Sequence, residues 1–582
     1  MNLENLTTIT NNHNTLIMKI KAKYFSIIWS MVSLLTIGNH VLFAQQGIVK
    51  KQLDADACVY GASPAGITAA IAIAREGYSA VIVEPTHKIG GLLSSGFRMA
   101  QDVPFADHLG GLTGAFYVTD TLFPKPRHPQ GVSKHSVQAL WDLVNQYPDL
   151  ITVITDHRIT AARTEKGVIK HAVFEFAPPD ENGVPLPHRK TANLTQVNAR
   201  MFIDASYEGD LMALSGVSYR VGKESRAQYG ESLAGVVISK KFPGVDPYKE
   251  KGNPASGLLS CIHPDPIGAE GDESRFFMAY NFKLAWEANP TPEFPGIPIT
   301  PPEEKNEDVY ELLNRYKEAG YSTHWPNENF SRGQLMTGAI PGMQVDYPEG
   351  DWSVRSRVWQ GFIDHIRTLT DFTGKEFRLL SDNNEHTNGW PSYLYIRSAR
   401  RMIGEYVMKQ QDIQLQTDIP DPIGMGYYMV DIYPNRMGVL EDGTLVTEGN
   451  LWEHVCPGPY QIPYGAIIPQ RKEIQNLLVP LCMSASHIAY SSIRMESTYM
   501  VMGESAGIAA ALAIKNKKAV QDIDRGELIS QLKRHGQLLE WDGKGYRYWR
   551  YNFIDNKPRT FPFRWDTHPE EYSKYPVKKL WR

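Results

Sequence analysis

The clearest alternation of apolar and polar segments lies in Asp56–Gly96. A short apolar run, Ala57–Tyr60, predicts a strand, and a second run, Ala80–Val83, predicts its neighbour. Between them, the segment Ile67–Glu76 is rich in Ala and Ile and predicts a helix, which Gly77 ends. The order strand, helix, strand indicates a βαβ unit with parallel strands.

Other apolar periodicities extend this α/β pattern along the chain. Strands are expected at Leu150–Thr155, Gly167–Phe176, Gln196–Ile203 and Gln475–Pro480. Helices are expected at Ser133–Val144, Asp308–Ala319, Ser353–Leu369, Ser392–Gln410 and Tyr499–Lys515. The alternation between residues 167 and 203 indicates a small antiparallel insertion. The middle of the chain, residues 215–450, is rich in Pro, Gly and aromatic residues, which is typical of irregular lining loops.

An isolated apolar run marks the N-terminus. Lysines precede the run Tyr24–Ile37, and the small residue Ala44 stands at a cleavage position. We therefore expect residues 1–44 to be a signal peptide, with Met18 as an alternative true start. The mature protein is expected to be exported, in a bacterium to the periplasm or beyond, without stable membrane insertion. The alternative is an uncleaved anchor, for which this run is short.

The composition is that of a globular protein, with 42% hydrophobic and 21% charged residues in 582. The net charge of −4 gives no basic surplus, so no nucleic-acid partner is expected. The scattered cysteines predict neither a metal site nor an iron–sulfur site; they are Cys58, Cys261, Cys456 and Cys482. Cys261 and Cys456 could be free, or paired in an oxidising compartment.

The segment Gly61–Gly66 has the residue types of a phosphate-binding turn. Gly61 permits a sharp turn out of the strand, and Gly66 allows close packing of helix and strand. Ser63 stands where a second glycine is usual, and its small size still lets the backbone approach a pyrophosphate. Pro64 suits the first helical position, and the helix N-terminus offers free N–H groups to phosphates.

Further features strengthen this prediction of a dinucleotide site. Glu84 ends the second strand, where a carboxylate can accept hydrogen bonds from ribose hydroxyls. Gly90 and Gly91 follow, and a glycine pair there brings a second backbone segment close to a pyrophosphate. Further along, the segment Phe202–Asp210 ends a predicted strand in a turn of small residues after Asp204.

With these segments in place, the chain resembles the FAD-dependent oxidoreductases of the heterodisulfide-reductase-A-like group, in particular their exported bacterial branch. The resemblance covers about Asp54–Lys515, and its most specific block is Leu477–Gly507. It implies a two-dinucleotide-binding-domain flavoprotein of the α/β class, with a Rossmann-like FAD-binding domain interleaved with an α+β substrate or cap domain. It also implies tightly bound FAD. The 4Fe–4S cluster of some relatives is not expected, because the ligand cysteines are absent.

The resemblance further implies which residues hold the cofactor. It assigns the ADP part to Gly61, Ser63, Ala65, Gly66 and Glu84. It places the flavin beside Gly90, Gly91, Leu92, Asp204, Ala205, Ser206 and the helix containing Gly503. The small residues of that helix also suit close packing, and its N-terminus can face the pyrimidine edge of a reduced flavin.

These assignments divide the chain into segments. We predict a signal peptide at 1–44, the first part of the FAD-binding domain at 54–215, a substrate or cap domain at 216–460, the C-terminal part of the FAD-binding domain at 461–541, and an aromatic-rich tail at 542–582. The tail could pack on the body or contact a saccharide.

Candidate catalytic residues follow the predicted strand at Gln475–Pro480. His487 is expected as a base because it titrates near neutrality, and a structural histidine at a strand end is the alternative. Arg494 is expected to hold an anionic group or to stabilise the reduced flavin, with Glu496 orienting either, unless the two form a local pair. Asn281 and Tyr395 are weaker lining candidates.

The predicted function is hydride transfer between FAD and a small molecule, with a carbohydrate-derived alcohol as the expected substrate. Arg397, Arg400 and Arg401 could meet an anionic substrate or the flavin, or form an arginine-laced face between domains. The alternatives are a non-catalytic glycan-binding flavoprotein and an electron-transfer subunit of a redox complex. The sequence leaves the oligomeric state open.

Overall fold

The computed structural model describes residues 48–95, 108–118, 131–187, 193–284, 286–287, 292, 295–321, 338–374, 376–380, 384–453 and 455–541. Apart from Ile48, these residues belong to one compact unit, Val49–Arg189 with Asn193–Arg582. The predicted signal peptide at 1–44 and the predicted tail at 542–582 lie outside the described residues.

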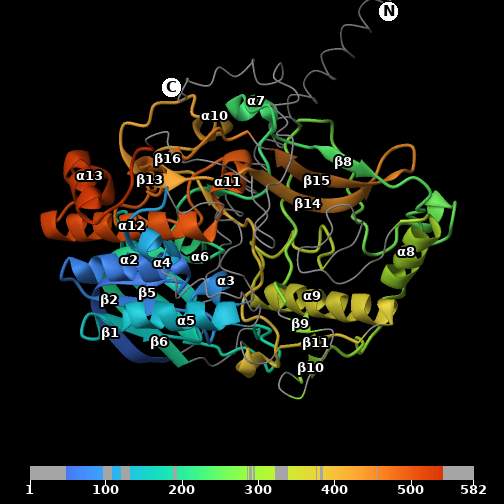
Figure 1. Cartoon of the computed structure of the whole chain (residues 1–582), viewed down its shortest axis with the longest axis horizontal. Coiled ribbons are helices and arrows are strands. Elements are labelled where there is room, and N and C mark those ends of the chain that lie inside the picture. Colours follow the sequence, from blue (N-terminus) through green and yellow to red (C-terminus); the bar gives the residue numbers. More distant parts are fainter. Residues whose placement is uncertain are drawn as a thin grey trace, which may run out of the picture. The chain divides into compact units, whose positions relative to one another are not determined.

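A seven-stranded sheet gathers strands from both ends of the chain, in the order β3-β2-β1-β6-β5-β4 with β17 also paired to β6 (Figure 1). Its strands are β1 (Ile48–Tyr60), β2 (Ala80–Val83), β3 (Ile151–Ile154), β4 (His157–Glu165), β5 (Val168–Phe176), β6 (Asn193–Asp204) and β17 (Leu477–Leu478). Strands β1, β2 and β3 pair in parallel, as do β6 and β17, whereas β4, β5 and β6 pair antiparallel. The Rossmann-like α/β class and the antiparallel insertion are therefore confirmed.

The burial of these strands explains why the parallel part forms. All of β2 and the last residues of β1 are buried, as expected for strands covered on both faces. Strand β4 was missed by the sequence pattern because its burial does not alternate strictly. The helices on this side of the molecule are α2 (Pro64–Arg75), α3 (Gly91–Ser94), α4 (Gly111–Val118), α5 (Gly131–Val144), α6 (Asp210–Leu214), α12 (Glu496–Asn516) and α13 (Arg525–Arg534). Helix α11 (His487–Ile493) packs instead against the second sheet described below.

Helix α12 runs beside α2 and contacts it closely (Figure 1). A Cβ atom built on Gly503 would lie 2.2 Å from the backbone oxygen of Ala65, and one on Gly507 would lie 2.3 Å from the backbone oxygen of Ala69. Both positions thus require glycine, which confirms the predicted close packing of this helix. Of the residues described, α12 is the one helix apolar and long enough to cross a membrane, and its whole apolar window is buried inside the protein.

A second sheet, in the order β14-β15-β8, forms in the middle of the chain (Figure 1). It consists of β14 (Val430–Val439), β15 (Leu445–Glu453) and β8 (Ile238–Lys241), all antiparallel. Short pairings accompany it: β7 (Tyr219–Arg220) with β12 (Arg401–Met402), β13 (Pro422–Gly426) with β16 (Tyr460–Pro463), and β11 (Arg378–Leu379) with β9 (Trp286–Glu287) and β10 (Ile297–Pro298). The helices here are α7 (Arg226–Tyr229), α8 (Glu307–Glu318), α9 (Trp352–Thr373) and α10 (Gln410–Ile413), and α8 and α9 confirm two predicted helices.

The helix predicted at Ser392–Gln410 is wrong. The segment is irregular up to α10 and contains only β12 as regular structure. Every residue from 391 to 402 is buried, and backbone groups there bond to other segments: the N–H of Tyr395 donates to the Asn281 carbonyl and that of Met402 to the Cys482 carbonyl. Contacts on all sides therefore override the helical periodicity.

Candidate functional site

The turn after β1 is built as the sequence predicts. Gly61 has φ +94°, and its N–H donates to the carbonyl of Val83, 2.8 Å away. A Cβ atom on Gly66 would lie 2.0 Å from the carbonyl oxygen of Gly61, so the turn closes against the first turn of α2. Ala65 lies in that first turn, at the N-terminus of the helix. The helix N-terminus therefore lies directly behind the turn, where it favours a phosphate.

Ser63 has a structural purpose at the position usually held by glycine. It is the N-cap of α2, and its side-chain oxygen accepts a hydrogen bond from the N–H of Gly66 at 3.3 Å. The same hydroxyl donates to the carbonyl oxygen of Ala205 at 2.7 Å. Ser63 thus caps the helix and fastens it to the turn that follows β6.

Glu84 holds the carboxyl end of β2 against the turn. One carboxyl oxygen accepts from the N–H of Ala62 at 2.7 Å and the other accepts from the N–H of Thr86 at 2.8 Å. Burial raises the pKa of Glu84 to about 7. Each carboxylate oxygen has a second lone pair, so Glu84 can still accept from a ribose hydroxyl.

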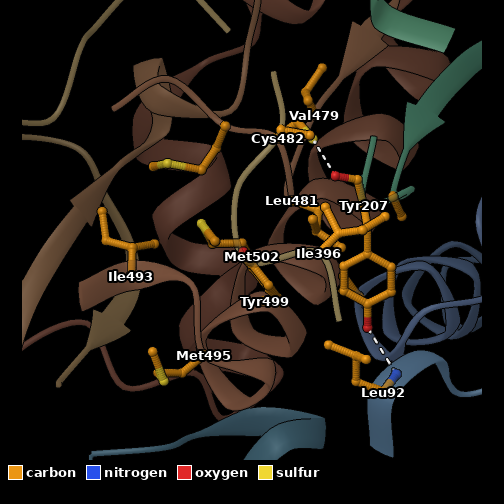
Figure 2. Packing of buried hydrophobic residues seen from close by; sticks show 14 of the residues in the cluster. Leu92, Tyr207, Ile396, Val479, Leu481, Cys482, Ile493, Met495, Tyr499 and Met502 are labelled. Atoms are coloured by element: carbon orange, nitrogen blue, oxygen red, sulfur yellow. Dashed lines mark hydrogen bonds between the residues drawn. The ribbon is translucent and has the colours of Figure 1, made fainter. Parts of the chain in front are cut away.

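The glycine pair at 90–91 meets this turn from another side. The N–H of Gly90 donates to the carbonyl of Ala62 at 2.7 Å, and both glycines have positive φ. The N–H of Leu92 donates to the hydroxyl of Tyr207 at 3.1 Å, and Figure 2 shows this ring extending toward Leu92, while the backbone carbonyl of Tyr207 faces Cys482. The sequence pattern did not single out Tyr207, which joins this segment to the turn after β6.

The turn after β6 is held by the carboxylate of Asp204. This group accepts from the N–H and hydroxyl of Ser206, at 3.1 and 2.7 Å, and from the N–H of Met212 at 2.7 Å. Burial raises the pKa of Asp204 to about 6. Asp204 therefore positions the turn, whereas its neighbours Ala205 and Ser206 line the cavity described next.

The Gly61 turn, the end of β2 at Glu84 and the turn after β6 border one cavity that is partly open to solvent, whereas Gly90, Gly91 and Leu92 are not among its lining residues. Its lining includes Gly61, Ser63, Glu84, Thr86, Arg158, Ala205, Ser206, Tyr207, Glu208, Tyr347, Trp352, Trp359, Tyr393, Leu394 and Ile396. The lining of this cavity therefore brings the predicted phosphate turn and the predicted ribose-binding carboxylate of Glu84 together.

Arg158 is a lining residue that the sequence pattern missed. Its Nε donates to Glu175, another N–H donates to the carbonyl of Leu186, and its guanidinium lies 4.4 Å from the ring centroid of Trp352. The remaining nitrogen, Nη2, has no hydrogen-bond partner among the described residues. A buried N–H group without a partner at the wall of the cavity fits a polar or anionic ligand there.

The family model for FAD dependent oxidoreductases matches residues 56–535. The chain belongs to this family. The turn, the glycine pair and the cavity are therefore parts of a Rossmann-like FAD-binding domain, and the protein is an FAD-dependent oxidoreductase. FAD fits the residues present: the Gly61 turn and the α2 N-terminus would hold its pyrophosphate, and Glu84 its ribose.

Solved structures show only distant similarity. The FrdA chain of a mutant E. coli quinol fumarate reductase is 12% identical with a TM-score of 0.28, and the match covers 83% of this chain and 74% of that one. L-proline dehydrogenase from P. horikoshii is 13% identical with a TM-score of 0.16, covering 32% of this chain and 26% of that one. THI4 from Thermovibrio ammonificans is 14% identical with a TM-score of 0.20, covering 35% and 79%. No curated protein gave a significant match.

His487 lies outside the cavity lining, at the start of α11. Its Nδ1 is 2.8 Å from a carboxyl oxygen of Glu224, and its Nε2 accepts from the N–H of Gly235 at 3.4 Å. Burial lowers the pKa of His487 to about 4, so the ring is neutral at pH 7. These contacts favour the structural alternative, while the role of His487 as a base stays a prediction.

Arg494 and Glu496 lie on either side of the start of α12 and do not pair with each other. The guanidinium of Arg494 donates to the hydroxyl of Tyr395 at 3.0 Å and to the carbonyl of Asp431 at 2.9 Å. Glu496 accepts from the hydroxyl of Tyr207 at 2.8 Å, and its second oxygen has no partner within the described chain. Burial raises the pKa of Glu496 to about 8. Glu496 therefore carries a proton at pH 7 and is linked by Tyr207 to the cavity.

A buried ion cluster stands behind the turn after β6. The carboxylate of Asp210 accepts from Arg355 at 2.6 and 2.7 Å and from Arg400 at 2.7 Å. Burial alone would raise the pKa of Asp210, but the two guanidinium groups hold it well below its usual range. Arg401 pairs with Glu224 at 2.8 Å. Arg400 and Arg401 are therefore ion-paired within the fold, which matches the structural alternative for them.

Gly503 lies within α12 against the backbone of α2, so its described contact is the helix packing reported above. Its contact with the flavin stays a prediction. Across the ranges that the structure covers, no group of three or more His, Cys, Asp or Glu residues could hold a metal ion. In the same ranges Cys58, Cys261, Cys456 and Cys482 are all free thiols, so Cys261 and Cys456 are not paired.

Glu496 provides a pH-dependent test. Because its pKa in the folded protein is about 8, well above about 4.3 for an ordinary glutamate, folding favours the protonated form. This contribution to stability is complete below about pH 4 and is lost as the pH rises through 8, at up to about 1.4 kcal/mol per pH unit. The difference in free energy of unfolding, wild type minus Glu496→Gln, should therefore decrease as the pH rises from 5 to 8.5, with roughly the slope that the linkage relation gives.

The measurement is urea unfolding of both proteins at several pH values. Other buried carboxyl groups titrate equally in the two proteins, so their effects cancel in the difference. Parallel stability profiles for the two proteins would show that Glu496 is ionised when folded.

Proposed function

We propose that this enzyme transfers a hydride between FAD and a small-molecule substrate, a carbohydrate-derived alcohol, and that it belongs to the exported branch of the heterodisulfide-reductase-A-like group. The observation that carries the redox part is the cavity that unites the Gly61 turn, Glu84 and the segment Ala205–Glu208. Support for a sugar comes from the aromatic side chains in its wall, and support for export from the signal-like pattern at residues 1–44.

In this proposal, bound FAD supplies the hydride acceptor or donor. The residues of the chain bind the cofactor, orient Tyr207 and hold a proton. The Gly61 turn and the N-terminus of α2 bind the pyrophosphate, and the N–H of Leu92 orients Tyr207. Glu496 holds a proton at its carboxyl group, which Tyr207 contacts from the cavity side. A group with a pKa near the working pH is suited to exchange a proton with a substrate hydroxyl.

The test is anaerobic reduction of the bound flavin. We expect the purified protein to carry FAD and its visible absorption to be bleached by one member of a panel of sugars, sugar alcohols and sugar acids. Glu496→Gln should keep FAD and slow bleaching by about 100-fold or more, because a general acid–base group contributes about 10²–10⁴. His487→Gln is the matched control, because it keeps a polar side chain of similar size at a residue outside the cavity lining, and it should bleach at the wild-type rate.

The outcomes test separately the redox activity, the sugar substrate and the identity of the acid–base residue. A purified protein without FAD contradicts the redox proposal. Bound FAD that no member of the panel reduces contradicts the sugar substrate and favours an electron-transfer or binding role. Full activity in Glu496→Gln together with slow bleaching in His487→Gln would return the base role to His487.

A further inference from the structure

A second polar cluster, separate from the cavity lining, is formed by Asn281, Arg397 and Arg494. These residues are buried and come from three distant parts of the chain. Asn281 and Tyr395 form a bridge, in which the Tyr395 N–H donates to the Asn281 carbonyl at 2.8 Å. The hydroxyl of Tyr395 then accepts from Arg494 at 3.0 Å. Tyr395 therefore contacts Asn281 through its backbone and Arg494 through its hydroxyl.

Arg397 is the most unusual member of the cluster. It is 1% exposed, and its guanidinium lies 4.2 Å from the ring centroid of Tyr395 and 3.7 Å from that of Tyr433. One nitrogen donates to the carbonyl of Ala279. The other two, Nε and Nη2, have no hydrogen-bond partner in the part of the chain that the structure describes.

Asn281 also has buried polar atoms without a hydrogen-bond partner among the described residues. Its side chain is 0% exposed, and within the described ranges neither its amide oxygen nor its amide nitrogen has a hydrogen-bond partner. Leaving such a group unpaired costs about 1–3 kcal/mol, and more for a charged group. Native proteins keep few unpaired buried polar groups, so two neighbouring residues with four such atoms indicate a ligand that completes them.

The charge balance of the cluster gives the sign of this ligand. Arg397 and Arg494 are neighbouring cations, and Asp431 lies 3.6 Å from Arg494. Among the described residues Arg397 makes no ion pair, and a buried guanidinium group without one favours an anionic ligand.

We propose that the cluster of Asn281, Arg397 and Arg494 binds the carboxylate of the substrate. The two unpaired N–H groups of Arg397 suit the two oxygens of a carboxylate, and the Asn281 amide can donate a further bond. Leu394 and Ile396, which flank Tyr395, line the cavity, so a carboxylate held here places the rest of the molecule next to that cavity. This inference rests on the proposed function and narrows its substrate to an acid, such as a sugar acid.

The experiment compares carboxylates with uncharged analogues on the FAD-loaded protein. Calorimetry and thermal unfolding are measured with acetate against acetamide and with galacturonate against galactose. We expect at least one carboxylate to bind and to raise the melting temperature, while its uncharged partner does neither. In Arg397→Met the affinity for that carboxylate should fall about 10- to 100-fold, because hydrogen bonds to charged groups are lost.

A matched control separates binding from folding. Arg401 is equally buried but is paired with Glu224. Arg401→Met should therefore lower the melting temperature, while the affinity for the carboxylate ligand stays as in wild type. Arg397→Met should lower the melting temperature of the ligand-free protein less than Arg401→Met does, because Arg397 has no ion pair with a described residue to lose. Arg397→Lys keeps the charge but lacks the planar pair of donors, and should bind about tenfold more weakly.

Binding of no carboxylate by wild type, or equal binding by wild type and Arg397→Met, would overturn the inference. These readouts do not depend on turnover. A protein that binds carboxylates but carries no FAD would contradict the proposed function alone, and a flavoprotein that binds no carboxylate would contradict this inference alone.

Discussion

Protein carrying Gly61→Ala is expected to lose most of its FAD. The new Cβ atom would lie 2.6 Å from the carbonyl oxygen of Ala205 and 2.8 Å from the nitrogen of Ser206, which are backbone atoms of the turn after β6. Gly61 also has φ +94°, which a residue with a side chain rarely adopts. The turn must therefore move, and with it the Ser63 hydroxyl that bonds to Ala205. We expect the FAD-to-protein ratio after gel filtration to fall at least about tenfold, which corresponds to roughly 1.4 kcal/mol or more of binding free energy.

Gly77→Ala is the matched control. Gly77 has φ +83°, so it imposes similar backbone strain, but no described atom lies within 4 Å of the Cβ position. This variant should lose about 1–2 kcal/mol of stability and keep its FAD. If Gly61→Ala kept FAD, the phosphate turn would be wrongly assigned. If both variants lost it, backbone strain rather than the crowded turn would be the cause.

The second large effect is expected from Asp210→Asn, which removes the one carboxylate that Arg355 and Arg400 share at 2.6–2.7 Å. Two buried guanidinium groups then lose their counter-charge, and breaking a buried pair in this way costs about 3–5 kcal/mol. We expect the free energy of unfolding, measured in urea at pH 7, to fall by that amount. Asp149→Asn, at an exposed position of the same chain, should change it by no more than about 0.5 kcal/mol.

The pH dependence of the stability loss in Asp210→Asn follows from the lowered pKa of Asp210. The pKa of Asp210 is lowered in the folded protein, so its contribution to stability is present above the ordinary aspartate pKa of about 3.9 and is lost as the pH falls. The difference between wild type and Asp210→Asn should therefore shrink below about pH 4. If Asp210→Asn lost no more stability at pH 7 than Asp149→Asn does, the cost of burying these charges would cancel the attraction between Asp210 and the two arginines.

The part of the site that the sequence could predict is the part encoded locally. The strand at Ala80–Val83 coincides with β2, and Glu84 meets the Gly61 turn as expected. Spacing and turn chemistry within about 30 residues are enough for these features. The middle of the chain is different, because its contacts join residues far apart, such as Arg355 and Asp210, which are 145 positions apart. Tyr207 and Arg158 carry no local motif, so their roles became visible only through their partners.

At Ser392–Gln410 the local sequence pattern predicts a helix that long-range contacts prevent. The periodicity of this segment is helical, yet its arginines contact carboxylates and tyrosines on different elements, and its backbone is irregular. Propensity is a weak guide wherever a segment is buried on all sides. A similar limit applies to the candidate base: the sequence places His487 after the strand at Gln475–Pro480, but only the fold shows that Glu224 contacts its Nδ1 and that His487 is not among the cavity-lining residues.

The contact between α2 and α12 has a consequence for biosynthesis. The hydroxyl of Thr68 donates to the carbonyl of Met500, 432 positions later, so α2, the first of the described helices to be synthesised, forms this contact only after α12 has been made. At about 5–20 residues per second, the apolar face of α2 stays without this partner for roughly 20–90 s of translation. Nascent chains of this protein should therefore depend on chaperones, and a stop codon before α12 should yield aggregates rather than a smaller flavoprotein.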